Sequence, residues 1–131
     1  MKEITVGAVA ADYYIVSDFV GAILESLHCP PKIQTKLDIA IDEIFGNIVK
    51  YSGAETITIR GGTEDDGMFV LIFIDDGTHY NPLDRPNPDI NADFEDRPIG
   101  GLGIFIVKKT MDEVFYEYKG GHNCLTIKKK L

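Results

Sequence analysis

Hydrophobic residues recur at steps of three and four in two stretches of the first half of the chain. In residues 12–28 they are Ile15, Val16, Phe19, Val20, Ile23, Leu24 and Leu27. This spacing places them on one face of a helix. It continues through residues 31–51, after two adjacent prolines that end the first helix and suit the start of the second. The pattern predicts two consecutive amphipathic helices.

The second half of the chain has the pattern of strands. Residues 4–6 already indicate a short first strand, and a short helix is expected at residues 104–111. Alternating or wholly apolar runs predict four more strands, at residues 56–60, 68–74, 114–118 and 125–130. The last two of these strands are separated by turn residues around Gly120, Gly121, His122 and Asn123. The length fits a single domain that covers residues 1–131.

Residues 78–99 follow neither the helical nor the strand period. This segment is rich in proline and in acidic residues. A stretch of this length without a pattern, inside a compact domain, is typical of a functional lid or of a disordered loop.

Composition narrows the function classes. The formal net charge of −8 argues against a general nucleic-acid-binding surface. The only two cysteines, Cys29 and Cys124, cannot form a disulfide framework or a four-ligand metal site, and they favour a reducing compartment. The sequence has no run with the length and apolarity of a membrane span, and no signal peptide at the amino terminus. We therefore expect a cytoplasmic protein that does not contact a membrane.

Glu43 and Asn47 lie four residues apart in the second predicted helix, so they share one face. An amide oxygen and a carboxylate at this spacing suit a Mg²⁺-phosphate site, with the amide as ligand and the carboxylate as base. A polar helix edge is the plain alternative. Gly46 lowers helix stability by roughly 1 kcal/mol relative to alanine, which suggests that something approaches closely there.

Asp75, Asp76 and Gly77 end an apolar strand. A carboxylate at this point lies at a pocket rim and can accept a hydrogen bond from an exocyclic amine such as that of adenine. A plain strand-ending turn has the same sequence pattern.

Gly100, Gly101, Leu102 and Gly103 precede the third predicted helix. Glycines allow the backbone to approach an anion, and a helix amino terminus supplies unpaired N–H groups for phosphate. A flexible hinge is the alternative. The spacing matches neither a Walker loop nor a dinucleotide fingerprint.

The order of these three motifs resembles that of the GHKL ATPases. Residues 42–47 resemble the N box of that superfamily, residues 74–83 its first glycine box, and residues 97–107 its second. The Asn-Pro-Leu at 81–83 and the Gly-Gly-Leu-Gly-Ile at 100–104 resemble the anti-sigma-factor serine kinases. The resemblance implies an α+β fold, the two-layer Bergerat sandwich, with a mixed and mostly antiparallel sheet covered by helices on one face.

The resemblance also implies roles for single residues. Glu43 would be the general base, and Asn47 would bind Mg²⁺ together with ATP. Asp75 and Gly77 would hold the adenine, and Gly101, Leu102 and Gly103 the phosphates. Residues 78–99 would form the ATP lid. His79 stands where the wider superfamily has a second glycine.

The resulting prediction is an ATP-dependent kinase for a serine of a STAS-domain anti-sigma-factor antagonist. The resemblance also suggests a sigma factor as a partner and a homodimer. Two alternatives remain: a non-catalytic module that binds ATP and a partner, and a detached histidine-kinase-like ATPase domain.

Overall fold

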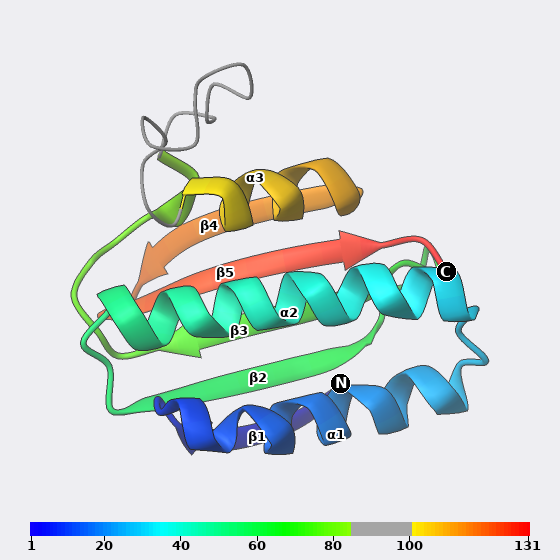
Figure 1. Ribbon diagram of the computed structural model, residues 1–131, viewed down its shortest axis with the longest axis horizontal. Helices are drawn as coiled ribbons and strands as arrows, with labels where there is room; N and C mark the ends of the chain where they lie inside the picture. Colours follow the sequence, from blue (N-terminus) through cyan, green and yellow to red (C-terminus); the bar gives the residue numbers. More distant parts are fainter. Residues whose placement is uncertain (85–100) are drawn as a thin grey trace.

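Five strands form one sheet, and three α-helices lie on one of its faces (Figure 1). The computed structural model describes residues 1–84 and 101–131, and these numbers of strands and helices refer to that part of the chain. The strands are β1 (Lys2–Gly7), β2 (Thr56–Thr63), β3 (Phe69–Asp75), β4 (Glu113–Lys119) and β5 (His122–Lys129). The helices are α1 (Tyr13–Ser26), α2 (Pro31–Tyr51) and α3 (Gly101–Thr110). Short 3-10 turns, η1 (Ala10–Asp12) and η2 (Pro82–Asp84), precede α1 and follow β3.

The sheet has the order β1-β2-β3-β5-β4, and each of these neighbouring pairs is antiparallel. The predicted two-layer α+β sandwich is thus confirmed. The register places Asp75, the last residue of β3, opposite Ile57 on β2 and opposite Asn123 on β5. The polar end of the central strand is therefore enclosed by strands on both sides.

The hydrophobic core fills the space between the sheet and the helices. The largest fully buried side chains come from both layers: Phe45, Phe69, Phe73, Leu24, Leu37, Ile41, Ile44, Ile57, Ile59, Leu71, Ile127 and Val16. Each such side chain stabilises the fold by roughly 1.5–3 kcal/mol relative to an exposed position. The predicted stripes of the first two helices supply the helical half of this core.

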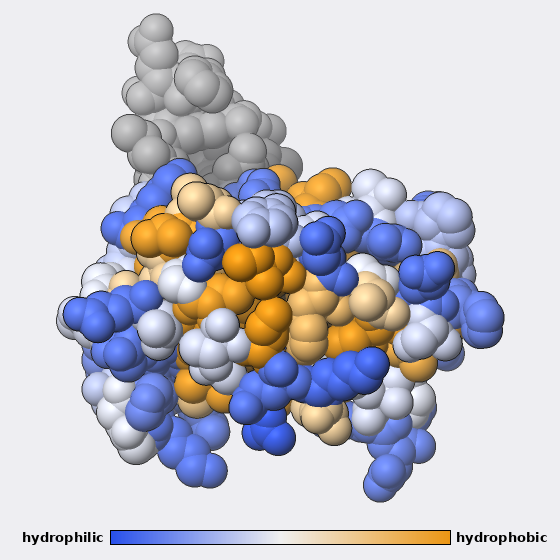
Figure 2. Space-filling view, turned by 90° about the horizontal axis from the view of Figure 1, so that it is seen from below, coloured by the Kyte–Doolittle hydropathy of each residue, from blue (hydrophilic) through white to orange (hydrophobic). Residues whose placement is uncertain are grey.

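Figure 2 shows the edge of the molecule on which α1 and β1 lie. Apolar side chains gather in the middle of this view, and hydrophilic ones surround them. Ile4 of β1 and Ile15 and Phe19 of α1 are only partly buried against the core. The apolar interior therefore reaches the surface at this edge. None of the helices in the described residues is long and apolar enough to cross a membrane.

Two boundaries differ from the sequence prediction and matter for the site. Helix α3 begins at Gly101, three residues before the predicted start, so the glycines form its first turn. The turn between β4 and β5 consists of two residues only, Gly120 (φ 59°) and Gly121 (φ 79°). Positive φ at both positions is what a tight type I′ hairpin requires. This short turn places Asn123 within β5, not in the loop where the sequence pattern put it.

Candidate functional site

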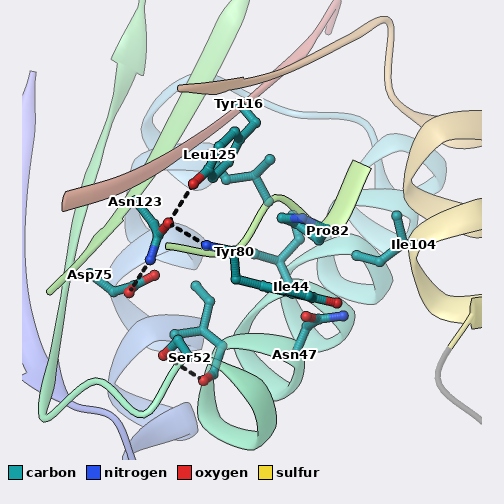
Figure 3. A pocket seen from close by; sticks show the side chains of 11 residues that line it. Ile44, Asn47, Ser52, Asp75, Tyr80, Pro82, Ile104, Tyr116, Asn123 and Leu125 are labelled. Atoms are coloured by element: carbon teal, nitrogen blue, oxygen red, sulfur yellow. Dashed lines mark hydrogen bonds between the residues drawn. The ribbon is translucent and has the colours of Figure 1, made fainter. Parts of the chain in front are cut away.

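A small cavity lies between α2, α3 and the adjacent ends of β3 and β5 (Figure 3). Its free space of about 20 Å³ is enough for about one water molecule. Two of the predicted site residues, Asn47 and Asp75, line it. The full lining is Ile44, Asn47, Ile48, Ser52, Asp75, Tyr80, Pro82, Ile104, Tyr116, Asn123 and Leu125. Apolar walls with a few polar groups are typical of ligand pockets.

Asp75 is the acidic group of this cavity, and only 4% of its surface is exposed. Its Oδ1 accepts hydrogen bonds from the Gly77 N–H at 2.9 Å and from the Asn123 side-chain amide at 3.0 Å. In Figure 3 the other carboxylate oxygen points toward the interior of the cavity. The apolar strand β3 thus carries an acid inward, and the protein holds one of its oxygens. The other oxygen is available as an acceptor for a ligand.

Gly77 allows the chain after β3 to pack directly on the end of α2. A Cβ atom on this residue would lie 2.3 Å from the carbonyl oxygen of Ser52, which is closer than any real contact. The next residue, Thr78, donates its N–H to that same oxygen at 2.7 Å. The described structure therefore gives Gly77 a packing role against Ser52, which lines the cavity, in addition to the base contact that the resemblance implies.

Asn123 is a residue of the site that the sequence analysis missed. It is 4% exposed, and its amide bonds to Asp75, to Tyr116 and to the backbone of residues 78 and 80. The signal was present in the strand alternation, since Asn123, Leu125 and Ile127 occupy every second position of β5 and are all buried. A polar residue in an inward position of a strand indicates a buried polar site.

Tyr80 reaches into the cavity from the segment after β3. Its ring crosses the space between Asn123 and α2, and its hydroxyl ends beside Asn47 (Figure 3). That hydroxyl is buried. A purine base is several times larger than one water molecule, so the Tyr80 side chain has to move before a base can enter.

Glu43 and Asn47 point to neighbouring spaces on α2. Asn47 lines the cavity and also borders a polar hollow of about 220 Å³ that Glu43 lines as well. Helix α3 packs closely on Glu43, because a Cβ atom on Gly103 would lie 2.1 Å from the Glu43 Oε2. The structure thus brings together the carboxylate, the amide and the first turn of α3, three features that the sequence analysis treated separately. Gly46, by contrast, has no atom of the described residues within 4 Å of its Cβ position apart from its chain neighbours and its own helix backbone, so no described part of the chain makes the close approach expected there.

The remaining predicted residues belong to the glycine segment and the lid. Gly101 and Leu102 lie in the first turn of α3, where N–H groups and the helix dipole favour an anion. Gly100 and residues 85–99 of the predicted lid lie outside the described residues. The root of the lid, residues 78–84, is fixed to the body of the domain, since Leu83 accepts a hydrogen bond from Lys108 of α3 at 3.2 Å.

His79 lies outside the cavity and packs on β4. Its ring stacks on Tyr116 with a centroid distance of 6.1 Å and an interplanar angle of 6°, and its centroid is 4.3 Å from that of Tyr118. The pKa of Tyr116 is raised, chiefly by burial of its hydroxyl. A hydrogen bond with the backbone of Tyr80 lowers the pKa in part, and the nearby Asp75 carboxylate raises it further. The Tyr116 hydroxyl therefore stays protonated and remains a donor at neutral pH.

The chemistry of these groups fits a Mg²⁺-bound nucleoside triphosphate. Mg²⁺ is usually held by one or two protein oxygens together with phosphates and water, and the Asn47 amide oxygen, which borders the polar hollow, is a group of that kind. Within the described residues no cluster of three or more His, Cys, Asp or Glu can hold a metal by itself. A metal at this position would therefore depend on the phosphates of the ligand.

Comparison with known proteins agrees with this geometry. The model of the histidine kinase-like ATPase domain family matches residues 8–129. A curated relative, the "Serine/threonine-protein kinase BtrW" of Bordetella bronchiseptica, is 24% identical over 102 residues, which cover 73% of this chain and 70% of the relative.

Proposed function

Because the chain belongs to the histidine kinase-like ATPase domain family, we propose that it is an ATP-dependent protein-serine kinase. The proposed substrate is a serine of a STAS-domain anti-sigma-factor antagonist. One observation carries the proposal beyond nucleotide binding: the Glu43 carboxylate lies against Gly103 at the start of α3, next to Asn47. In this proposal Glu43 is the general base, and the terminal phosphate lies beside it at the start of α3 when the base of the nucleotide is at Asp75.

Each residue has a simple task in this mechanism. The free oxygen of Asp75 accepts the exocyclic amine of the base, and the first turn of α3 faces the phosphates. The serine hydroxyl oxygen forms a bond to the γ-phosphorus, and Glu43 takes the proton of that hydroxyl. The bond from that phosphorus to the bridging oxygen breaks, and ADP leaves with the electron pair. Mg²⁺, bound through Asn47, would neutralise phosphate charge. Positioning and charge neutralisation account for most of the catalysis in such reactions.

The second candidate is a non-catalytic module that binds ATP and a partner protein. It needs the base cavity around Asp75 and has no use for a carboxylate at Gly103. The close packing of Gly103 on Glu43 favours the kinase, since an alanine there would displace the carboxylate and glycine costs helix stability of roughly 1 kcal/mol.

The relative described above is named as a serine/threonine-protein kinase, which supports serine over histidine as the acceptor. A sigma factor as a second partner and a homodimer are parts of the same proposal. The apolar edge at α1 and β1 is a surface on which a second copy can pack (Figure 2).

Phosphate transfer to a purified partner tests this function. Each STAS-domain protein encoded in the same genome is incubated with this chain and γ-labelled ATP, and the labelled product is treated with acid. We expect one partner to carry an acid-stable label, because phosphoserine survives acid and phosphohistidine does not. Glu43→Ala should bind ATP and transfer no label. An acid-labile product, or full transfer by Glu43→Ala, would contradict the proposal.

A further inference from the structure

The side-chain amide of Asn123 has only one possible orientation. Its nitrogen donates to the Thr78 carbonyl oxygen at 2.9 Å and to Asp75 at 3.0 Å. Its oxygen accepts the Tyr80 backbone N–H at 3.1 Å and the Tyr116 hydroxyl. A backbone carbonyl can only accept a hydrogen bond and a backbone N–H can only donate one. A rotated amide would therefore place its oxygen against the Thr78 carbonyl oxygen and its nitrogen against the Tyr80 N–H. These two backbone groups thus fix which end of the amide faces Asp75.

This orientation decides what the Asp75 carboxylate can offer a ligand. Both protein donors, the Gly77 N–H and the Asn123 amide nitrogen, act on the same oxygen, Oδ1. A carboxylate accepts hydrogen bonds and has no proton to donate. The oxygen that points into the cavity therefore acts only as an acceptor (Figure 3). A ring amine satisfies it, whereas a ring carbonyl at the same place would be repelled.

We propose that Asn123, itself held by Tyr116, is the positioning residue that makes this pocket select an amine-bearing purine over a carbonyl-bearing one. This inference rests on the proposed function, because it concerns the same nucleotide site. Without the amide, the carboxyl group can rotate about its Cβ–Cγ bond and loses one of the two donors that balance its charge. The repulsion of a carbonyl then weakens together with the attraction of an amine.

Tyr116 supports the amide from β4. The hydrogen bond of its hydroxyl to Asn123 joins β4 to β5 above the cavity, and the stacked His79 ring restricts the movement of its own ring. Tyr118, two residues further along β4, also contacts His79 but makes none of the hydrogen bonds to Asn123. The chain thus supplies a matched control, a second tyrosine on the same strand whose hydroxyl lies outside the network.

The test measures affinity for ATP and for inosine triphosphate, which carries a carbonyl in place of the adenine amine. The variants are Tyr116→Phe, Asn123→Leu and the control Tyr118→Phe. We expect wild type to prefer ATP by at least about 100-fold, as sites built around a buried hydrogen-bonding group do. Tyr116→Phe should lower this ratio by roughly 3- to 10-fold, as expected for the loss of one hydrogen bond. Asn123→Leu should lower it further, and Tyr118→Phe should leave it unchanged.

A purely structural role for Asn123 would give a different result. It would lower thermal stability and weaken both nucleotides by the same factor, so an unchanged ratio in Tyr116→Phe would overturn the inference. That variant decides the matter even if Asn123→Leu fails to fold, because it removes a single hydroxyl. A wild-type chain that binds ATP without preferring it over inosine triphosphate would refute the inference alone. Failure to bind either nucleotide would refute the proposed function as well.

Discussion

Replacing Gly103 by alanine tests the arrangement of α3 on the catalytic carboxylate. The added Cβ would lie 2.1 Å from the Glu43 Oε2 and 2.8 Å from its Cδ. To reach the 3.4 Å of ordinary contact, the oxygen has to move by about 1.3 Å. Since it is the end of a flexible side chain, this movement costs little stability, and alanine gains up to about 1 kcal/mol of helix propensity. We expect a protein as stable as wild type or more stable.

Phosphate transfer should nevertheless fall in this variant. A displacement of about 1 Å in a catalytic group can cost on the order of 100-fold in rate, which corresponds to about 2.7 kcal/mol. Single-turnover transfer to the partner measures the rate, and urea unfolding measures the stability. Gly21→Ala is the matched control, because Gly21 is also helical and, in the part of the chain that the structure describes, only its chain neighbours and its own helix backbone lie within 4 Å of its Cβ position. It should stabilise α1 and leave transfer unchanged.

Shortening the carboxylate should relieve the collision. In a Glu43→Asp background, the carboxylate is withdrawn by one methylene group, and Gly103→Ala should then cost much less in rate than it does beside glutamate. Additive effects of the two substitutions would show that Gly103 and Glu43 act independently. Full activity of Gly103→Ala alone would refute the reasoning, because the carboxylate would then not need its observed position.

Three further predictions concern the cavity and the thiols. Gly77→Ala should lower the free energy of unfolding in urea by about 2 kcal/mol or more, since its Cβ would meet the Ser52 backbone oxygen, which cannot rotate away; an unchanged midpoint would contradict this. Tyr80→Ala should speed the association of a fluorescent ATP analogue in stopped flow by roughly tenfold, because the cavity no longer has to be vacated; slower association would mean that the ring assists entry. Burial raises the pKa of the Cys29 and Cys124 thiols, so both should react with a disulfide reagent more slowly than free cysteine at pH 8, with the rate increasing above the ordinary thiol pKa; equal rates at pH 8 would show that the thiols are not shielded.

The first two helices were predictable because the periodic spacing of apolar residues is repeated over many positions in each of them. For α2 the predicted residues 31–51 match the structure, with Pro31 as its first residue. The start of α3 was predicted three residues too late, since glycines disfavour a helix locally by roughly 1 kcal/mol each. In the structure, packing against Glu43 of α2 offsets that preference. A contact between distant segments thus overrides the local propensity.

The polar network of the site was only partly predictable. Asp75 could be placed because it directly follows an apolar strand. For Asn123 the strand alternation was the one signal, and it competed with a turn, because Gly120, Gly121, His122 and Asn123 all suit a turn and the sequence alone does not say which of them the turn uses. The position of Tyr80 in the cavity has no local signal, since it depends on the Asn123 contact to its backbone. Side chains that meet across three strands are fixed by the register of the sheet.

Binding of Mg²⁺-ATP by wild type and by Asp75→Asn, measured by isothermal titration calorimetry, tests the central claim most directly. The substitution keeps the size of the side chain and removes the charge that accepts the base amine. We predict clear binding by wild type and its loss in the variant. Equal binding by both proteins would place the nucleotide elsewhere, and no binding by wild type would contradict the account as a whole.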